Sequence, residues 1–292
     1  MNTDISSYKR NVWKRYFPFF VFLIPSLVLF IFAYAYPFFS GLSLAFTDWD
    51  GISQAYHFVG FKNFVQMASD TALHHDIVIT LVYAVCATAL NNIIALGLAL
   101  LLNKNFKFSA INKTIFFIPM ALSPVLASFI WSFIDSKIYA QVIHGHSLLA
   151  SPKTVILGII IIALWNGVGS NTMIYLAGLT NIPHECLESA SIDGASGWNR
   201  LRYVILPLLG PSYTVCITLT LTSSLREFAT VLSATNGGPA RSSETVAIFI
   251  YRNLFQYYKA GYGQAVALIF MIILIVLGIG LNKFFRSREV EL

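Results

Sequence analysis

Residues 154–183 read TVILGIIIIALWNGVGSNTMIYLAGLTNIP, thirty consecutive positions without an Asp, Glu, Lys or Arg. An α-helix rises about 1.5 Å per residue, so about 20 such residues cross a hydrocarbon core about 30 Å thick. Inside lipid every backbone N–H and C=O group needs an internal partner, which a helix provides. The run therefore predicts a membrane-spanning helix.

Five further runs are also free of charged residues: 16–47, 77–102, 114–134, 203–225 and 260–282. Hydrophobic residues make up 57% of the 292 positions and charged residues only 11%, which excludes a soluble enzyme, a disordered chain and a disulfide-rich secreted scaffold. Continuous apolar runs also argue against a β-barrel, whose strands alternate. We predict an all-α polytopic bundle of six transmembrane helices, with residues 16–285 forming one membrane domain.

The basic residues indicate the orientation of this bundle. With the N-terminus in the cytoplasm, the cytoplasmic segments hold 12 Lys or Arg and 6 acids, and the outer segments hold 7 of each. This asymmetry follows the positive-inside rule, so the net charge of +6 reflects topology and not nucleic-acid binding. We expect both tails, 1–15 and 286–292, to be cytoplasmic. The first apolar run is too long for a signal-peptide core and is expected to remain as a span.

The residues that usually carry chemistry form no recognisable site. The three cysteines lack the spacing of a zinc or redox site, and His144 and His146 lack further ligands, so we expect no metal. No Gly-Lys pair occurs, so the chain has no Walker A motif. We also find no nucleophile–base pair or paired carboxylates. The chain is therefore not expected to be an enzyme or to bind a cofactor.

One polar segment, residues 181–211, interrupts the apolar pattern and reads NIPHECLESASIDGASGWNRLRYVILPLLGP. Pro183 suits the first turn of a helix, and Asp193-Gly194 is a turn or helix-stop pair. A second helix is expected to resume near Trp198 and to enter the membrane at Pro207. Two helical halves around a glycine are more than a plain connector needs, and they suggest a docking element for another protein.

This segment resembles the cytoplasmic EAA loop of binding-protein-dependent ABC importer permeases. The loop's pattern is Glu-Ala-Ala, three residues, Gly, nine residues, Ile, one residue and Leu-Pro. Every spacing is matched by Glu188-Ser189-Ala190, Gly194, Val204 and Leu206-Pro207. The two departures, Ser for Ala and Val for Ile, are small.

Further stretches narrow the resemblance. Residues 175–183 and 192–196 are similar to the carbohydrate branch of this family, the maltose-type permeases. Thr235–Pro239 and Glu244-Thr245 resemble the outer loop of the first of the two permease subunits in such systems. The resemblance covers roughly residues 16 to 285.

The resemblance implies a type I ABC importer permease fold in the plasma membrane of a bacterium or archaeon. It implies a heterodimer with a second permease, two subunits that bind ATP and Mg, and an extracytoplasmic solute-binding protein that delivers a carbohydrate. The solute would cross by alternating access, and nucleic acid would play no part. The loop, residues 181–207, would dock in the ATPase. The residues expected to couple transport to the ATPase are Glu188, Ser189, Ala190, Asp193, Gly194, Ala195, Leu206 and Pro207.

Polar residues within the spans are the candidates for a solute pathway, because polar groups in lipid are costly. We expect Asn92, Trp165, Asn166, Asn171 and Arg226 to line it, since sugars bind amide groups and aromatic faces. Interhelical hydrogen bonding is the alternative for each Asn, and a place at the outer interface is the alternative for Arg226. Gly237, Gly238 and Pro239 are expected to form a turn near the outer mouth.

Other functions remain open at this point. The solute could instead be another small molecule, such as a glycerol-phosphate ester, which Arg226 would suit. A secondary transporter or channel would more typically show inverted repeats or intramembrane acids, and it would leave the loop unexplained. An intramembrane enzyme lacks catalytic residues.

Overall fold

The computed structural model describes residues 3–103, 109–139, 141 and 147–289. Within these ranges every regular element is helical, apart from one isolated bridge between Thr47 and Phe58. The all-α prediction is therefore confirmed. The chain forms two compact units, which are Met1–Gln66 with Asn253–Leu268, and Met67–Arg252 with Ile269–Leu292.

Within the described residues, four helices are long and apolar enough to cross a membrane: Pro18–Leu44, Thr71–Leu102, Val155–Thr180 and Ala260–Arg286. Two further pairs of helical segments are bent, Lys113–Ala121 with Pro124–Tyr139 by 107°, and Gly197–Leu208 with Gly210–Leu225 by 71°. Up to six spans result if each bent pair is one span. The runs 114–134 and 203–225 are thus not single straight helices.

A helix start inside the apolar run explains the first bend. Helix α5 (Ser109–Phe117) and η2 (Ile118–Ala121) end before Ser123, which is extended with ψ 149°. The Ser123 hydroxyl accepts a hydrogen bond from Leu126 N at 3.2 Å, and Pro124 occupies the first turn of α6 (Pro124–Phe133). Ser followed by Pro is a helix N-terminus signal, and here it overrides the continuous hydrophobicity.

Prolines also account for two π-helical segments. In η1 (Ile31–Ala35) the N–H of Tyr36 reaches back five residues to Ile31 O, and Pro37 follows. In η4 (Leu201–Ile205) the N–H of Leu206 reaches Leu201 O in the same way, and Pro207 follows. Since proline has no N–H to donate, the ladder shifts its register just before it. The second helix of the loop begins at α10 (Gly197–Arg200), close to the predicted position. It bends after α11 (Leu206–Leu208).

The first unit contains α1 (Thr3–Phe30), η1, α2 (Tyr36–Leu44), and parts of α3 (Lys62–Ser69), α14 (Val246–Phe255) and α15 (Ala260–Arg286). The buried Asn63 donates to Ala45 O at 2.9 Å and to Thr47 O at 2.8 Å, which ties α3 to the end of α2. In the exposed loop between α2 and α3, hydrogen bonds from the Ser53 hydroxyl and from the backbone N–H groups of Ile52 and Ser53 lower the pKa of Asp50 to about 2.

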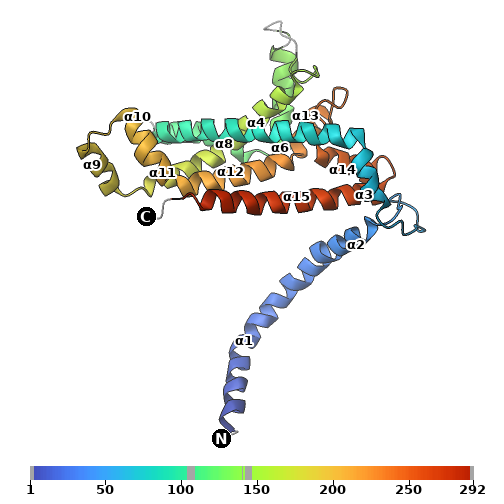
Figure 1. Cartoon of the computed structure of the whole chain (residues 1–292). Coiled ribbons are helices and arrows are strands. Elements are labelled where there is room, and N and C mark those ends of the chain that lie inside the picture. Colours follow the sequence, from blue (N-terminus) through green and yellow to red (C-terminus); the bar gives the residue numbers. More distant parts are fainter. Residues whose placement is uncertain (1–2, 104–108, 140, 142–146, 290–292) are drawn as a thin grey trace. The chain divides into compact units, whose positions relative to one another are not determined.

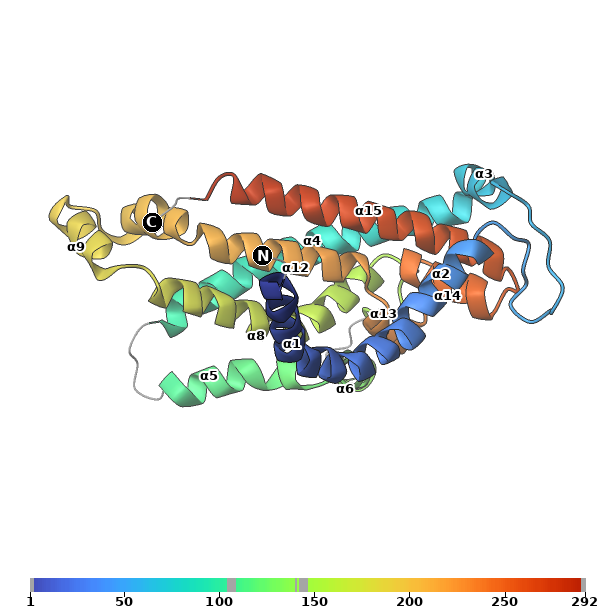
Figure 2. The ribbon, with the colours of Figure 1, turned by 90° about the horizontal axis from the view of Figure 1, so that it is seen from below.

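The second unit is built on α4 (Thr71–Leu102), α8 (Val155–Thr180) and α12 (Gly210–Leu225), which lie side by side (Figure 1, Figure 2). Asp70 caps α4 by accepting hydrogen bonds from Ala72 N and Leu73 N. Gly178 of α8 lies so close to Leu209 and Ser212 that a Cβ atom there would collide with them. Small residues thus let the helices of this core approach closely. Helix α13 (Ala229–Thr235) follows α12.

Candidate functional site

The polar loop folds into α9 (His184–Ile192), which lies at the end of the helix bundle beyond α8 (Figure 1). Pro183 precedes α9 in an extended conformation, with φ −58° and ψ 134°. Ile182, one residue earlier, is buried in a cluster with Leu179 and Leu209. This apolar contact anchors the start of α9 to the bundle.

The C-terminal end of α9 explains the glycine of the motif. Gly194 has φ +78°, a conformation that residues with a side chain rarely adopt. Its N–H donates to Ser191 O at 3.2 Å, and the N–H of Ala195 donates to Ala190 O at 2.8 Å. These two bonds form a Schellman motif, which stops a helix. The helix stop predicted at Asp193-Gly194 is therefore confirmed.

The other coupling candidates divide between two faces of the loop. Ala190 is 8% exposed, and Leu187 packs on the buried cluster. Glu188, Ser189 and Asp193 are not buried in this way and lie on the outer side of the loop. Helix α9 thus rests on the side that carries Leu187 and Ala190 and turns the side with Glu188 and Ser189 outward.

The remaining candidates lie on the return path to the membrane. Ala195, Leu206 and Pro207 are half-buried, and Pro207 stands in the first turn of α11. Helix α9 also packs against η4, the segment that precedes Leu206. The structure therefore joins all eight predicted coupling residues in one continuous helix–turn–helix element. Its outer surface also carries Ile192 and Trp198, which were not selected from the sequence and which are 85% and 66% exposed.

A second candidate region is a polar cavity of about 470 Å³ between α4, α8 and α12. Asn166 and Asn171 lie in its wall, and Arg226 with Glu227 lies where α12 ends. These belong to a larger polar lining of amide, hydroxyl and charged side chains. The polar lining residues are Tyr83, Asn91, Asn166, Ser170, Asn171, Thr220, Thr222, Ser223, Ser224, Arg226, Glu227 and Thr230.

Hydrogen bonds across the three helices hold the wall of this cavity. The Asn171 amide of α8 donates to Asn91 Oδ1 of α4 and to Thr220 Oγ1 of α12, each at 2.7 Å. The Asn166 amide donates to Pro119 O at 2.8 Å and to Leu122 O at 3.1 Å. Both amide groups therefore act as donors that connect α8 to neighbouring segments.

Two of the predicted pathway residues lie elsewhere. Asn92 is buried and accepts a hydrogen bond from the Tyr175 hydroxyl at 2.8 Å. Trp165 packs edge-on against Trp131, with ring centroids 6.0 Å apart. Neither residue belongs to the cavity lining. Their positions match interhelical contacts, the alternative considered for the amides, and the structure brings together only Asn166, Asn171 and Arg226.

The hydroxyl groups that α4 and α12 place on the cavity wall were not selected from the sequence. Tyr83, Thr220 and Ser223 sit within apolar runs and read as ordinary span residues. A signal was present in residues 214–224, TVCITLTLTSS, because hydroxyl residues recur there at short intervals. Their recurrence predicts a polar stripe on α12, but not which neighbour it faces.

The predicted outer turn adopts an unusual backbone. Gly237 has φ +75°, and Asn236, Ala240 and Arg241 also have positive φ. Gly237 is buried against Glu244 and Arg252, and Pro239 follows Gly238. These residues do not line the cavity, although the segment that contains them begins directly after α13.

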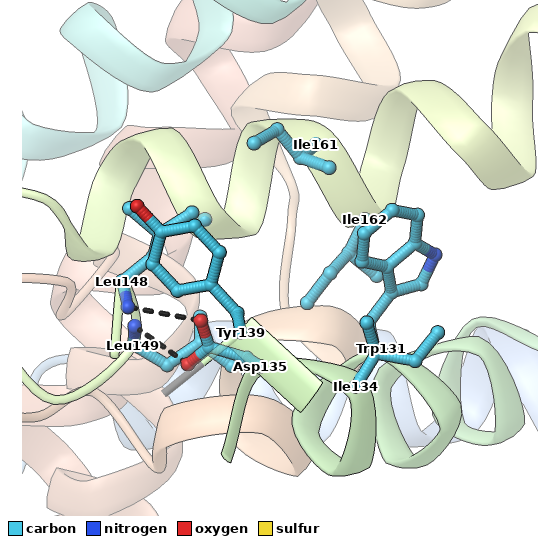
Figure 3. Close-up of a pocket in the computed structure, with 9 residues that line it drawn as sticks. Trp131, Ile134, Asp135, Tyr139, Leu148, Leu149, Ile161 and Ile162 are labelled. Atoms are coloured by element: carbon cyan, nitrogen blue, oxygen red, sulfur yellow. Dashed lines mark hydrogen bonds between the residues drawn. The ribbon is translucent and has the colours of Figure 1, made fainter. Parts of the chain in front are cut away.

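A smaller pocket of about 90 Å³ is mostly apolar and lies beside α6, η3 (Ile134–Tyr139) and α8 (Figure 3). Its acid, Asp135, accepts hydrogen bonds from Leu148 N at 2.9 Å, from Leu149 N at 3.2 Å and from the Ser147 hydroxyl. Through these hydrogen bonds, Asp135 holds the residues that precede α8 against η3.

No group of three His, Cys, Asp or Glu side chains suited to a metal occurs in the described part of the chain. His144 and His146 lie outside the described residues.

Comparison with known proteins supplies a further finding. The profile of the family described as "Binding-protein-dependent transport system inner membrane component" matches residues 91–289. The chain is 30% identical over 291 residues to the "Probable starch degradation products transport system permease protein AmyD" of Thermoanaerobacterium thermosulfurigenes, with 98% of each chain covered. It is 29% identical over 289 residues to the "Multiple sugar-binding transport system permease protein MsmF" of Streptococcus mutans, with 96% of this chain and 99% of that protein covered.

A solved structure is similar in fold. It belongs to a bacterial ABC transporter involved in the import of the acidic polysaccharide alginate. The TM-score is 0.83 at 20% identity, and the match covers 96% of this chain and 99% of that chain. At this identity the likeness concerns the fold alone.

Proposed function

Because the chain belongs to the family of binding-protein-dependent transport system inner membrane components, and is therefore a permease subunit of an ABC importer, we propose that its cargo is a carbohydrate. The names of its sugar-transport relatives support this assignment. The cavity supports it too, because amide and hydroxyl groups are the partners that sugar hydroxyls need.

The observation that carries the proposed mechanism is the shape of α9. It is a short helix that is anchored through Ile182, stopped by Gly194 and turned outward along its Glu188 side. A rigid element of this kind moves as one body when a partner subunit binds it. We infer that α9 seats in a cytoplasmic ATPase subunit, and that closure of two such subunits rocks the bundle between inward- and outward-facing states.

We also propose the partner proteins that ATP-driven transport of the sugar requires. A second permease would complete the pathway, two ATP-binding subunits would hydrolyse ATP with Mg, and an extracytoplasmic protein would deliver the sugar. The chain would lie in the plasma membrane of a bacterium or archaeon with both ends in the cytoplasm. Its own residues would bind the solute and transmit the movement, without a cofactor.

The test uses the complex purified through a tag on this chain and placed in liposomes with the loaded binding protein. Uptake of labelled maltotriose and other sugars is measured together with ATP hydrolysis, and glycerol 3-phosphate serves as the rival solute. Glu188→Ala is compared with Glu185→Ala, because both side chains belong to α9 but only Glu188 belongs to the motif.

We expect Glu188→Ala to reduce coupled uptake about tenfold or more, the effect of losing one hydrogen bond to a charged group, and Glu185→Ala to change it less than about twofold. Equal effects of the two variants would refute the role of α9. Sugar uptake by this chain alone would refute the importer assignment, and uptake of glycerol 3-phosphate in place of every sugar would refute the cargo.

A further inference from the structure

Three buried polar residues form a stripe along the outer part of α4. Asp76, Thr80 and Tyr83 are 0%, 2% and 1% exposed and stand at positions i, i+4 and i+7, which share one face of a helix. Buried polar groups need hydrogen-bond partners, and an unpaired buried charge is costly. The positions of their partners therefore show what the stripe holds.

All three bind the segment that leads from α12 to α14. Asp76 Oδ2 accepts a hydrogen bond from Arg241 Nη2 at 2.7 Å. Thr80 Oγ1 accepts one from Val246 N at 2.9 Å, and the Tyr83 hydroxyl lies 3.5 Å from Glu227 Oε2. One face of one helix thus contacts the outer loop, the start of α14 and the acid of the cavity lining.

The loop end of this arrangement is a buried ion cluster. Glu244 is fully buried and pairs with Arg241 Nε at 3.2 Å and with Arg252. Arg252 also donates to Asn236 O at 2.7 Å. The positive charges of Arg241 and Arg252 therefore neutralise the carboxylates of Asp76 and Glu244. The Arg252 bond to Asn236 O also stabilises the turn that begins at Asn236.

The cavity end shares residues with the same loop. Glu227 Oε1 accepts a hydrogen bond from Thr230 N at 2.8 Å, and Glu227 O accepts one from the Thr245 hydroxyl at 2.8 Å. Thr245 directly follows Glu244 of the ion cluster. A displacement of the turn therefore acts on Glu227 by two routes, through Thr245 and through α4.

We propose that Asp76, Thr80 and Tyr83 are positioning residues that make the outer loop Asn236–Thr245 and the cavity acid Glu227 one mechanical unit. A partner that binds the loop from outside would thereby reshape the cavity. This inference rests on the proposed function, because it takes the cavity as the solute path and the loop as the extracytoplasmic side.

The test compares Thr80→Val with Thr172→Val. Both hydroxyls are buried in α-helices and donate to a carbonyl oxygen four residues earlier, but only Thr80 also accepts a hydrogen bond from another segment. In the reconstituted complex, Thr80→Val is expected to lower maximal sugar uptake at least fivefold. The concentration of binding protein for half-maximal uptake should change less than twofold. Thr172→Val should change neither value more than twofold, and Thr80→Ser should restore uptake.

A second measurement is independent of the solute. Ser223→Cys places a thiol on the cavity wall, in a background carrying Cys86→Ala and Cys186→Ala. The rate at which this introduced thiol reacts with a water-soluble thiol reagent is measured with and without the loaded binding protein. We expect the binding protein to change this rate at least threefold in the wild-type and Thr172→Val backgrounds. The change should be less than 1.5-fold with Thr80→Val or Asp76→Asn. The double variant Asp76→Asn/Arg241→Gln should take up sugar at least as fast as the slower of the two single variants, Asp76→Asn and Arg241→Gln, because both substitutions break the same ion pair.

Identical behaviour of the two Val variants would overturn the positioning role. So would multiplied effects in the double variant, or a wild-type thiol rate that the binding protein leaves unchanged. A complex that takes up no sugar but shows the predicted thiol pattern would refute the cargo proposal and leave the stripe supported.

Discussion

The Gly194→Ala variant isolates the contribution of one backbone conformation to coupling. Gly194 ends α9 with φ +78°, and nothing lies within 4 Å of the place where a Cβ atom would be added. The substitution therefore introduces no collision. Its whole cost comes from placing a residue with a Cβ atom in the left-handed region, which is about 1–2 kcal/mol.

A penalty of this size shifts the equilibrium constant between the present loop ending and its alternatives by a factor of about 5–30. The hydrogen bonds of Ser191 O and Ala190 O to the turn are made only in that ending. If the ATPase recognises α9 in this form, the apparent affinity of the ATPase for α9 falls by up to the same factor. Asn tolerates the left-handed region better than Ala, so Gly194→Asn should lie between Ala and the wild type.

The assay measures ATP hydrolysis stimulated by the loaded binding protein, together with sugar uptake, in the reconstituted complex. Gly60→Ala is the control for backbone strain, because Gly60 lies in the loop between α2 and α3 with φ +59°, and a Cβ atom added there would meet only Phe58 Cε1, at 3.9 Å. We expect full coupling in that control. Wild-type coupling in Gly194→Ala would refute the reasoning, and so would a Gly194→Asn variant weaker than Gly194→Ala, since that order follows size and not backbone conformation.

Three further predictions concern the bundle and the outer loop. Asn171→Leu removes two hydrogen bonds of 2.7 Å and should lower the stability by about 1–3 kcal/mol and also weaken the affinity for sugar. Asn92→Leu should lower the stability alone, so thermal unfolding and the uptake KM distinguish the two variants. Gly178→Ala overpacks the contact with Leu209 and should destabilise the complex by about 1–3 kcal/mol in a thermal melt, and an unchanged melt would contradict the close packing. Asp50 has a pKa of about 2 in the folded protein, against an ordinary value of 3.8, so its stabilisation of the loop is present above pH 3.8 and is lost as the pH falls through 2. The amide NMR signals of Ile52 and Ser53, which donate hydrogen bonds to Asp50, should therefore stay constant from about pH 5 to 8.

Sequence hydrophobicity predicted the helical class and the positions of the four helices that are long and apolar enough to cross a membrane. Hydrophobicity alone did not locate the bend in residues 114–134, but the prolines in the sequence predict kinks or span ends, and the bends lie next to Pro124 and Pro207. The Ser123-Pro124 pair is a helix N-terminus signal, but hydrophobicity alone gives every apolar residue the same weight. The loop was more predictable than the spans. Its glycine and proline act locally, through backbone conformation, and need no neighbour to take effect.

The solute pathway was less predictable for a geometric reason. Neighbouring residues on an α-helix point about 100° apart, so Asn91 and Asn92 must face different surroundings. Asn91 lines the cavity and Asn92 meets Tyr175. Nothing in the residue type distinguishes them. Their roles depend on the rotation of α4 against α8 and α12, which the whole set of interhelical contacts determines.

The buried ion cluster also changes how the charge pattern of this chain is understood. The count of seven basic and seven acidic residues in the outer segments treats all of them as though they were in solvent. Asp76 and Glu244 are in fact fully buried, and they pair with Arg241 and Arg252. Removing these two pairs from the count leaves the outer balance at zero, so the excess of positive charge remains on the cytoplasmic side. The charges cancel within the two pairs, so the predicted asymmetry does not depend on them, and the orientation stays a prediction.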